Sequence, residues 1–382
     1  MMPKSRFNSF MSRLLLAAAA ATALAPATAS AWWNKDWAYR KEITLDAGDK
    51  GIKLGEDLHD APVLIRLHEG VLHFTDTKDD GSDLRFVAGD DKTPLKFHIE
   101  KFDAVFNLGF VWVRVPELKK GQQTKLWMYY GNPNATAGDE PAASYDSAQV
   151  LDYHFGEKGG MALDTTAYKN NATSAVAIQE SGLIGNAAKF DGNTALLLPQ
   201  TAALNQASGA PMTWSAWIKP AAAEQDAVIY AHFHGGSGLV VGLEKGQPYV
   251  RIIDESGQVR QSPPMAAIAA NSWHHLALVT SGQATLYLDG AAGPSMPAAL
   301  PLLDGAASLG GQAVNGGVMA GFRGEIDELE IANVARSAAL LALLAVNQGE
   351  GDRLVSFGAD EAPSSWSSGY VGIILGSVTL DG

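Results

Sequence analysis

Short segments of alternating apolar and polar residues, separated by glycine, asparagine and proline, run through most of this 382-residue chain. Residues 39–45 alternate strictly, and residues 110–115 and 125–130 are rich in β-branched and aromatic side chains. A period of two is typical of half-buried β-strands, because successive side chains of a strand point to opposite faces of a sheet. Most of the 40 glycines separate such segments. The pattern predicts an all-β protein.

The spacing of these segments predicts two β units. Residues 32–138 are expected to form a β-sandwich. Residues 145–347 contain at least eight short strand candidates, a number that suits a two-sheet jelly-roll. The small, polar and proline-containing segment 139–144 predicts a linker. Ser337 fits the N-cap position of the Ala/Leu-rich run 338–346, so we expect a short buried helix to close the jelly-roll.

Residues 1–31 carry the three regions of a secretory signal peptide. Positively charged residues precede an apolar run at 14–25, and small residues lead up to Ala31. We expect cleavage after Ala31, which gives a periplasmic or secreted chain that begins at Trp32. The apolar run is too short to span a bilayer, so an uncleaved anchor is the less favoured alternative.

The last segment, residues 348–382, is predicted to be an apolar C-terminal tail. Large apolar side chains recur between Trp366 and Leu380, and each would cost about 1.5–3 kcal/mol if left in water. We expect this stretch to lie at a membrane interface or on a partner rather than to pack fully onto either unit. Deleting residues 364–382 is then expected to abolish membrane association and to leave the Tm nearly unchanged.

The composition excludes several functions. Aspartate and glutamate number 41 against 28 lysines and arginines, a net charge of −13, which opposes non-specific binding to nucleic acid. An acidic surface instead suits a protein partner in an envelope complex. Cysteine is absent, so disulfides, thiolate zinc sites and a cysteine nucleophile are excluded.

Three motifs of the second unit resemble concanavalin A-like, laminin G-like jelly-rolls. They are residues 212–220, 271–290 and 322–337, and they occur in the order found in that family. The resemblance implies a core strand, a central hairpin, and a closing strand followed by a helix. It also implies a structural role for His274 and His275.

The first unit resembles a domain of unknown function that commonly precedes such jelly-rolls. The resemblance rests on residues 33–40, 82–86, 111–116 and 128–133. In one branch of bacterial proteins this pair of domains forms the periplasmic N-terminal region of MotA/TolQ/ExbB-type proton-channel subunits. The resemblance implies docking to an energy-coupling complex. The channel itself is not carried over, because no membrane helix follows in the printed sequence.

Glu325, Asp327 and Glu330 have the E-x-D-x-x-E spacing of laminarinase-type glycosidases, which share the jelly-roll fold. Retaining hydrolysis needs two carboxylates about 5–5.5 Å apart. On a regular strand Glu330 points away from the other two, and only a bulge would bring it round. Leu329 and Ile331 would then share a face with Glu325 and Asp327 and turn that face inward. We therefore expect a structural strand and no catalysis.

Metal binding is a further hypothesis. Asp164, Asn171 and Asp327 are expected to supply oxygen ligands to a structural Ca²⁺ ion, because related folds bind calcium between such a loop and the closing strand. An ordinary Asx-rich turn is the alternative. His232 and His234 could form half of a zinc or copper site. No third ligand is evident nearby, so we expect two surface histidines.

Three functions remain open. The favoured one is a non-enzymatic periplasmic recognition or docking module of an ExbB/TolQ-like complex, whose partner is an envelope protein complex or a glycan. The second is a secreted, lectin-like carbohydrate-binding protein. Trp214 and Trp217 lie three apart on a strand and face opposite ways, so one of them is expected in the core and the other at the surface. With aromatic residues at only 8% of the chain, no obvious platform for stacking sugars is evident. The third, least favoured, is a jelly-roll glycosidase. No cofactor other than calcium is expected.

Overall fold

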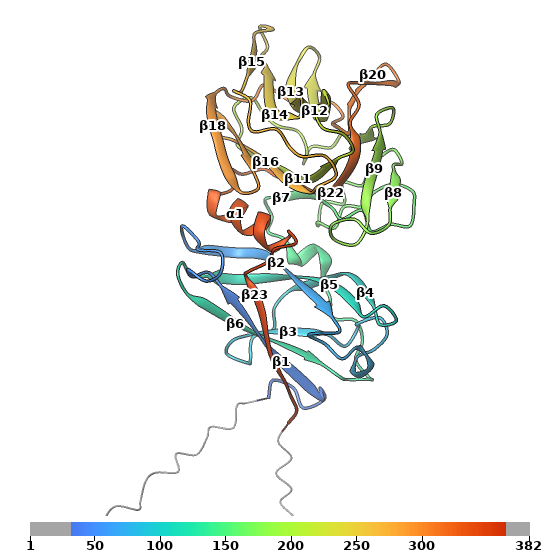
Figure 1. The fold of residues 1–382 in the computed structure, drawn as a ribbon, viewed down its shortest axis with the longest axis vertical. Coiled ribbons are helices and arrows are strands. Elements are labelled where there is room, and N and C mark those ends of the chain that lie inside the picture. The colour runs from blue at the N-terminus through green and yellow to red at the C-terminus, as the bar shows by residue number, and fades with distance from the viewer. Residues whose placement is uncertain (1–31, 364–382) are drawn as a thin grey trace, which may run out of the picture.

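The computed structural model describes residues 32–363, which form two stacked β units with one α-helix between them (Figure 1). The predicted signal peptide at 1–31 and residues 364–382, with the predicted membrane-associated stretch, lie outside the described residues. The all-β architecture is confirmed. Within residues 32–363, no helix is long and apolar enough to cross a bilayer.

The N-terminal unit is a sandwich of two antiparallel sheets. One sheet has the order β23-β1-β6-β3, and the other has the order β2-β5-β4. Ile43, Val63 and Val113 are fully buried between the sheets, as the alternation predicts. The strands are β1 (Tyr39–Asp46), β2 (Leu58–His68), β3 (Arg85–Ala88), β4 (Phe97–Asp103), β5 (Leu108–Leu118), β6 (Gln123–Tyr130) and β23 (Val355–Glu361), and η1 (Phe74–Asp76) is a 3₁₀ turn.

Strand β23 comes from the far end of the chain and completes the four-stranded sheet. It pairs antiparallel with β1, where Val355 lies opposite Leu45. Leu354, just before it, is fully buried in the core of the N-terminal unit. The predicted tail boundary at residue 348 is therefore corrected: the chain returns from the jelly-roll to the first sandwich. This pairing joins strands from opposite ends of the chain, so local periodicity could not reveal it.

The second unit is a jelly-roll of two antiparallel sheets. One has the order β18-β17-β16-β11-β22-β9-β8, with β7 also paired to β22, and the other has the order β10-β19-β12-β13-β14-β15. A small hairpin, β20-β21, projects from the second sheet. The strands are β7 (Gln149–Tyr153), β8 (Ala177–Gln179), β9 (Ala187–Asp191), β10 (Leu196–Leu197), β11 (Met212–Pro220), β12 (Ala227–His234), β13 (Ser237–Glu244), β14 (Gln247–Ile253), β15 (Val259–Gln261), β16 (His274–Thr280), β17 (Gln283–Leu288), β18 (Ala291–Pro297), β19 (Ser308–Leu309), β20 (Gln312–Val314), β21 (Gly317–Met319) and β22 (Arg323–Ala332).

The segment predicted as a linker, residues 139–144, is held against the first unit. It contains a short 3₁₀ turn, η2 (Pro141–Ser144). The amide of Glu140 donates to the carbonyl of Phe97 on β4 at 2.8 Å, and the guanidinium of Arg114 on β5 donates to the carbonyl of Ala143 at 3.2 Å. These bonds fix the direction in which the chain enters the jelly-roll.

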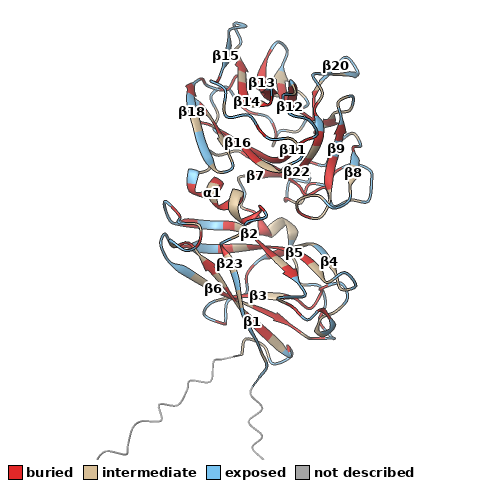
Figure 2. Ribbon diagram, in the orientation of Figure 1, coloured by how far each residue is buried: buried red, intermediate tan, exposed pale blue. Residues whose placement is uncertain are grey.

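Helix α1 (Ala338–Asn347) lies between the two units (Figure 1). The predicted N-cap is confirmed, because the Ser337 hydroxyl accepts a hydrogen bond from the amide of Leu340 at 3.2 Å. All residues of the helix before Asn347 are alanine, leucine or valine, so it has no polar face to turn to water. Its leucines pack into the core of the N-terminal unit, and the buried residues of the helix lie where the units meet (Figure 2).

We predict that a chain ending after Asp352 loses at least about 3 kcal/mol of stability, since it lacks Leu354 and the whole of β23. A chain that ends after Pro363 keeps both and is the matched control, and its Tm should stay within a few degrees of that of residues 32–382. Differential scanning calorimetry measures both. Equal melting temperatures for the two truncated chains would contradict the assignment of β23 to the N-terminal sandwich.

Candidate functional site

The closing strand of the jelly-roll, β22, contains a β-bulge. Ser215 on β11 lies opposite Glu330, and Trp217 lies opposite Asp327. Between these pairs, two residues of β22 therefore face a single residue of β11. The first of the two, Glu328, has a φ of 50°, in the left-handed region that side chains disfavour. The bulge shifts the alternation of the strand by one residue.

This shift decides which side chains face outward from the jelly-roll. Leu329 and Ile331 are buried in its core. Asp327 and Glu330 lie on the opposite face of the strand, and Glu330 lines a pocket together with Pro62 of the N-terminal unit. The prediction that Leu329 and Ile331 share a face with Asp327 is wrong, because it assumed a regular strand. The bulge needed to bring Glu330 round is present.

Each of the three glycosidase-like carboxylates has a partner inside the protein. Glu325 pairs with the ammonium of Lys219 at 3.5 Å. Asp327 is fully buried and accepts a hydrogen bond from the amide of Ile184 at 2.9 Å. Glu330 is also buried, and its two oxygens accept hydrogen bonds from two glutamine side chains. Asp327 and Glu330 therefore already accept hydrogen bonds within the protein.

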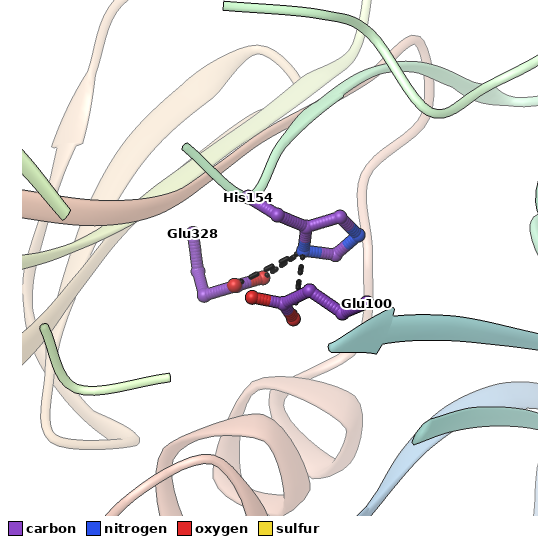
Figure 3. A group of neighbouring side chains, drawn as sticks. All are labelled: Glu100, His154 and Glu328. Carbon is purple, nitrogen blue, oxygen red and sulfur yellow. Dashed lines mark hydrogen bonds and ion pairs between the residues drawn. The ribbon is translucent and has the colours of Figure 1, made fainter. Parts of the chain in front are cut away.

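Three ionisable side chains from both units meet at the interface (Figure 3). His154 follows β7, Glu328 is the bulge residue of β22, and Glu100 lies on β4 of the N-terminal unit. The two oxygens of Glu328 lie 3.0 and 2.8 Å from Nδ1 of His154, and Oε2 of Glu100 lies 3.4 Å from the same nitrogen. We call Glu100, His154 and Glu328 the interface triad.

Side chains around the interface triad fix its geometry. The ring of His154 stacks on Trp112 of β5, with ring centres 5.4 Å apart, and on His98 of β4, with centres 5.0 Å apart. Nε1 of Trp112 donates to Oε2 of Glu100 at 2.7 Å. On the other side of the imidazole, the Tyr145 hydroxyl lies 2.9 Å from Nε2. The triad therefore sits in an aromatic cage built by both units.

Burial and neighbouring carboxylates disfavour the charged forms of the ionisable side chains in this region. Burial raises the pKa of Glu100 well above its usual range, and the negative charge of Asp327 raises it further. The pKa of Glu328 is raised in the same way by burial and by Glu100. Burial also raises the pKa of Asp152 and lowers the pKa of His154. Several acidic groups thus lack enough positive charge to remain ionised.

Two polar contacts and an apolar cluster join the units beside the triad. The side-chain amide of Asn347, at the end of α1, accepts from the amide of Leu64 at 2.7 Å and donates to its carbonyl at 3.0 Å. The guanidinium of Arg66 donates to the carbonyl of Asn347 at 2.6 Å. Ile184 of the jelly-roll packs with Leu64 and Trp112. The triad is therefore enclosed by a continuous interface.

The predicted calcium ligands are distributed over two places. Asp164 and Asn171 share one loop, where the Asn171 side chain accepts from the amide of Asp164 at 2.8 Å. The Asp164 carboxylate itself accepts from the amides of Asp152, Thr166 and Asn170 and from the Thr166 hydroxyl, as in an Asx-rich turn. Asp327 is held by other partners on β22, the amides of Ile184 and Glu328. Calcium binding stays a prediction.

The other predicted site residues are also placed. His234 is exposed and pairs with Asp304 at 2.7 Å, whereas His232 is buried and its Nε2 lies 2.9 Å from the carbonyl of Gly305. The expectation of two surface histidines is therefore wrong for His232. Trp214 and Trp217 are both buried, so neither offers a ring to a sugar.

Sequence reasoning missed the interface triad. Asp152 and His154 are polar residues two apart in an otherwise apolar stretch, which is the local signal that a buried polar site could leave. Glu328 could not be recognised, because on a regular strand its side chain would point away from the face that carries Asp327. Glu100 belongs to the other unit, and no local pattern connects it with the jelly-roll.

Two family models match successive parts of the chain, and the first match extends from the N-terminal unit into the start of the jelly-roll. Residues 80–171 match the family described as a domain of unknown function, DUF2341. Residues 190–342 match the Laminin_G_3 group of the concanavalin A-like lectin/glucanases superfamily. The chain carries a DUF2341 domain followed by a concanavalin A-like domain. Neither match connects it with MotA/TolQ/ExbB-type proteins. No curated protein matches the sequence.

Several solved structures are similar to part of the chain. They include the binding domain of Paraclostridial Mosquitocidal Protein 1, at 15% identity and a TM-score of 0.44 over 52% of each chain. The binding domain of botulinum neurotoxin serotype G has 15% identity and a TM-score of 0.42, over 52% of this chain and 50% of that chain. Domain 4 of AbnA, a GH43 extracellular arabinanase from Geobacillus stearothermophilus in complex with arabinotriose, has 19% identity and a TM-score of 0.44, over 53% of this chain and 100% of that chain. The match spans about half the length of the first two structures, and these scores carry no argument about function.

The buried histidine His275 gives the fold a pH dependence with a defined sign. Burial lowers its pKa from 6.5 to about 4. Between these values the unfolded chain takes up a proton that the folded chain does not, so stability is fully present above pH 6.5 and falls as the pH drops toward 4, by up to about 3 kcal/mol from this group.

We predict that His275→Gln lessens this acid-induced loss, because glutamine does not titrate. Urea unfolding at several pH values between 4.5 and 7.5 measures the free energy of unfolding for both chains. The difference between wild type and variant should shrink as the pH falls. A difference that is constant over this range would contradict a neutral, buried imidazole at this position.

Proposed function

We propose that this protein is a non-enzymatic glycan-recognition module, and that its binding groove lies on the outer side of the six-stranded sheet. That side is far from the N-terminal unit, at the end of the molecule that carries β12 and β20 (Figure 1). The eight-stranded sheet, by contrast, turns its outer face to α1 and the N-terminal unit. The six-stranded sheet is therefore the face that is accessible to a large ligand.

The observation that supports this proposal best is the position of Phe233. Its ring lies against Gly238 on the neighbouring strand. Any side chain at position 238 would place its Cβ atom within 2.2 Å of the ring. The ring thus covers the backbone of Gly238 and lines an open groove, whose other wall is the β20-β21 hairpin with Gln312 and Asn315. A partly exposed aromatic ring beside side-chain amides is the combination that binds sugar faces and hydroxyls.

We predict that Phe233→Ala weakens glycan binding by up to about tenfold, since an aromatic stacking contact contributes about 0.5–1.5 kcal/mol beyond its buried area. A glycan array on residues 32–363 finds the ligand, and calorimetric titration compares the variants. Phe106→Ala is the control, because Phe106 is a phenylalanine 80% exposed at the tip of the β4-β5 hairpin, in the other unit. Equal affinity of Phe233→Ala and wild type, or a wild type that retains no glycan, would overturn the proposal.

The burial of Asp327 and Glu330 supports the absence of glycosidase activity. A general acid must reach the leaving oxygen, and these carboxylates already accept hydrogen bonds beneath the interface. We predict that the wild type releases no reducing sugar from β-glucans or arabinans. Sustained release that is lost in Glu325→Gln would refute this.

Docking to an ExbB/TolQ-like envelope complex is a second candidate function. It is supported by the start of the described chain and the end of β23, which lie together at the end of the molecule opposite the groove (Figure 1). A module attached there would present its groove outward. The chain that ends after Pro363 tests this candidate: it should lose membrane association in cells, and unchanged partitioning would contradict it. Export to the periplasm is part of this proposal.

A further inference from the structure

Two buried carboxylate oxygens beside the interface triad have no hydrogen-bond donor among the described residues. They are Oε1 of Glu100 and Oδ1 of Asp152, and the two side chains are only 3% and 2% exposed. Leaving a buried polar atom without a partner is costly, and more so when the group is charged. Both groups lie beside the same imidazole nitrogen, because Oε2 of Glu100 and Oδ1 of Asp152 are 3.4 and 3.6 Å from Nδ1 of His154.

The spacing of the ligand atoms fits a small cation. One nitrogen or oxygen from each member of the triad lies within 4.8 Å of the other two. A tetrahedral ion with ligand distances of about 2.0–2.2 Å holds its ligand atoms about 3.3–3.6 Å apart. The distances from Nδ1 of His154 to the oxygens of Glu328, Glu100 and Asp152 are 2.8, 3.4 and 3.6 Å. Small side-chain movements therefore bring the three ligand atoms of the triad to one centre, and Asp152, which lies outside this group, needs a larger rotation of its side chain to join them.

We propose that Glu100, His154 and Glu328, with Asp152 as the fourth ligand, bind one Zn²⁺ ion that bridges the two domains. Glu100 lies on β4 of the N-terminal unit, and the other three ligands lie on or beside β7 and β22 of the jelly-roll. An imidazole ligand favours zinc over calcium or magnesium, which prefer all-oxygen sites. The Tyr145 hydroxyl at Nε2 of His154 and the indole N–H of Trp112 at Glu100 orient the ligands from the second shell.

The surroundings define the kind of zinc site. Four protein ligands in a buried position make a closed, structural site rather than a catalytic one with an open coordination position. The positive charge of Arg66, whose guanidinium donates to the carbonyls at the end of α1, offsets part of the negative charge of Glu100 and Glu328, and a divalent ion would offset the rest. The ion would hold the two units in one relative orientation. This site is distinct from the predicted calcium loop at Asp164.

The experiment measures metal content and Tm of residues 32–363 at pH 7.5. We expect about one zinc per chain by mass spectrometry after dialysis against zinc, a Tm several degrees higher with zinc than with EDTA, and no comparable effect of calcium. Glu100→Gln replaces one carboxylate oxygen of the ligand from the N-terminal unit by an amide nitrogen, and should remove most of this rise in Tm. Glu325→Gln, on the same strand as Glu328 but paired with Lys219, is the control and should retain it.

Co²⁺ provides a readout that does not depend on any variant. In the metal-free wild type it should give the intense visible absorption of tetrahedral coordination, and zinc should displace it. The proposal is overturned if the wild type binds no zinc after such treatment, if Glu100→Gln keeps the full zinc-dependent rise in Tm, or if bound Co²⁺ shows only the weak spectrum of the hydrated ion.

Discussion

The association of the two units depends on a helix without a polar face, whose leucines must be buried. Each turn of α1 carries leucines or alanines around its whole circumference, and the helix packs against β2 on one side and lies beneath the jelly-roll on the other. Burying Leu341, Leu343 and Leu344 in the core of the N-terminal unit contributes about 1.5–3 kcal/mol for each side chain. The chain then continues into β23 and completes a sheet of the first sandwich. The two units are therefore joined by the apolar residues around α1 and by a strand that follows the jelly-roll in the chain.

This docking creates an unusual polar interior. Apolar contacts around Ile184 and Trp112 exclude water from the same interface that receives Glu100, Asp152 and Glu328. In such a setting a carboxylate must take up a proton or meet a cation. The raised pKa values of these carboxyl groups correspond to the uptake of a proton, and the proposed zinc ion is the cation. Either way, the stability of the domain interface is linked to the ionic state of a few side chains rather than to apolar area alone.

A single bulge in β22 connects the shared fold of the concanavalin A-like domain with the particular chemistry of this chain. Without the extra residue, Glu328 would lie on a regular strand and Leu329 would point toward the N-terminal unit. With it, the apolar residues fill the jelly-roll core and the acidic residues line the interface. The motif that resembles a glycosidase site is thereby enclosed, and the accessible face of the domain is the opposite sheet with Phe233.

Local patterns in the sequence determined much of the fold. The alternating segments at 110–115 and 125–130 became β5 and β6, and Ser337 with the Ala/Leu run became a capped, buried helix, because side-chain period and capping act over a few residues. Only the tertiary structure decided that β23 joins the first sheet, that β22 changes face at Glu328, and that Glu100 meets His154. His154 and Glu328 lie 174 positions apart in the chain. Their contact depends on strand pairing and domain docking, which are set by the summed packing of many distant residues rather than by any local pattern.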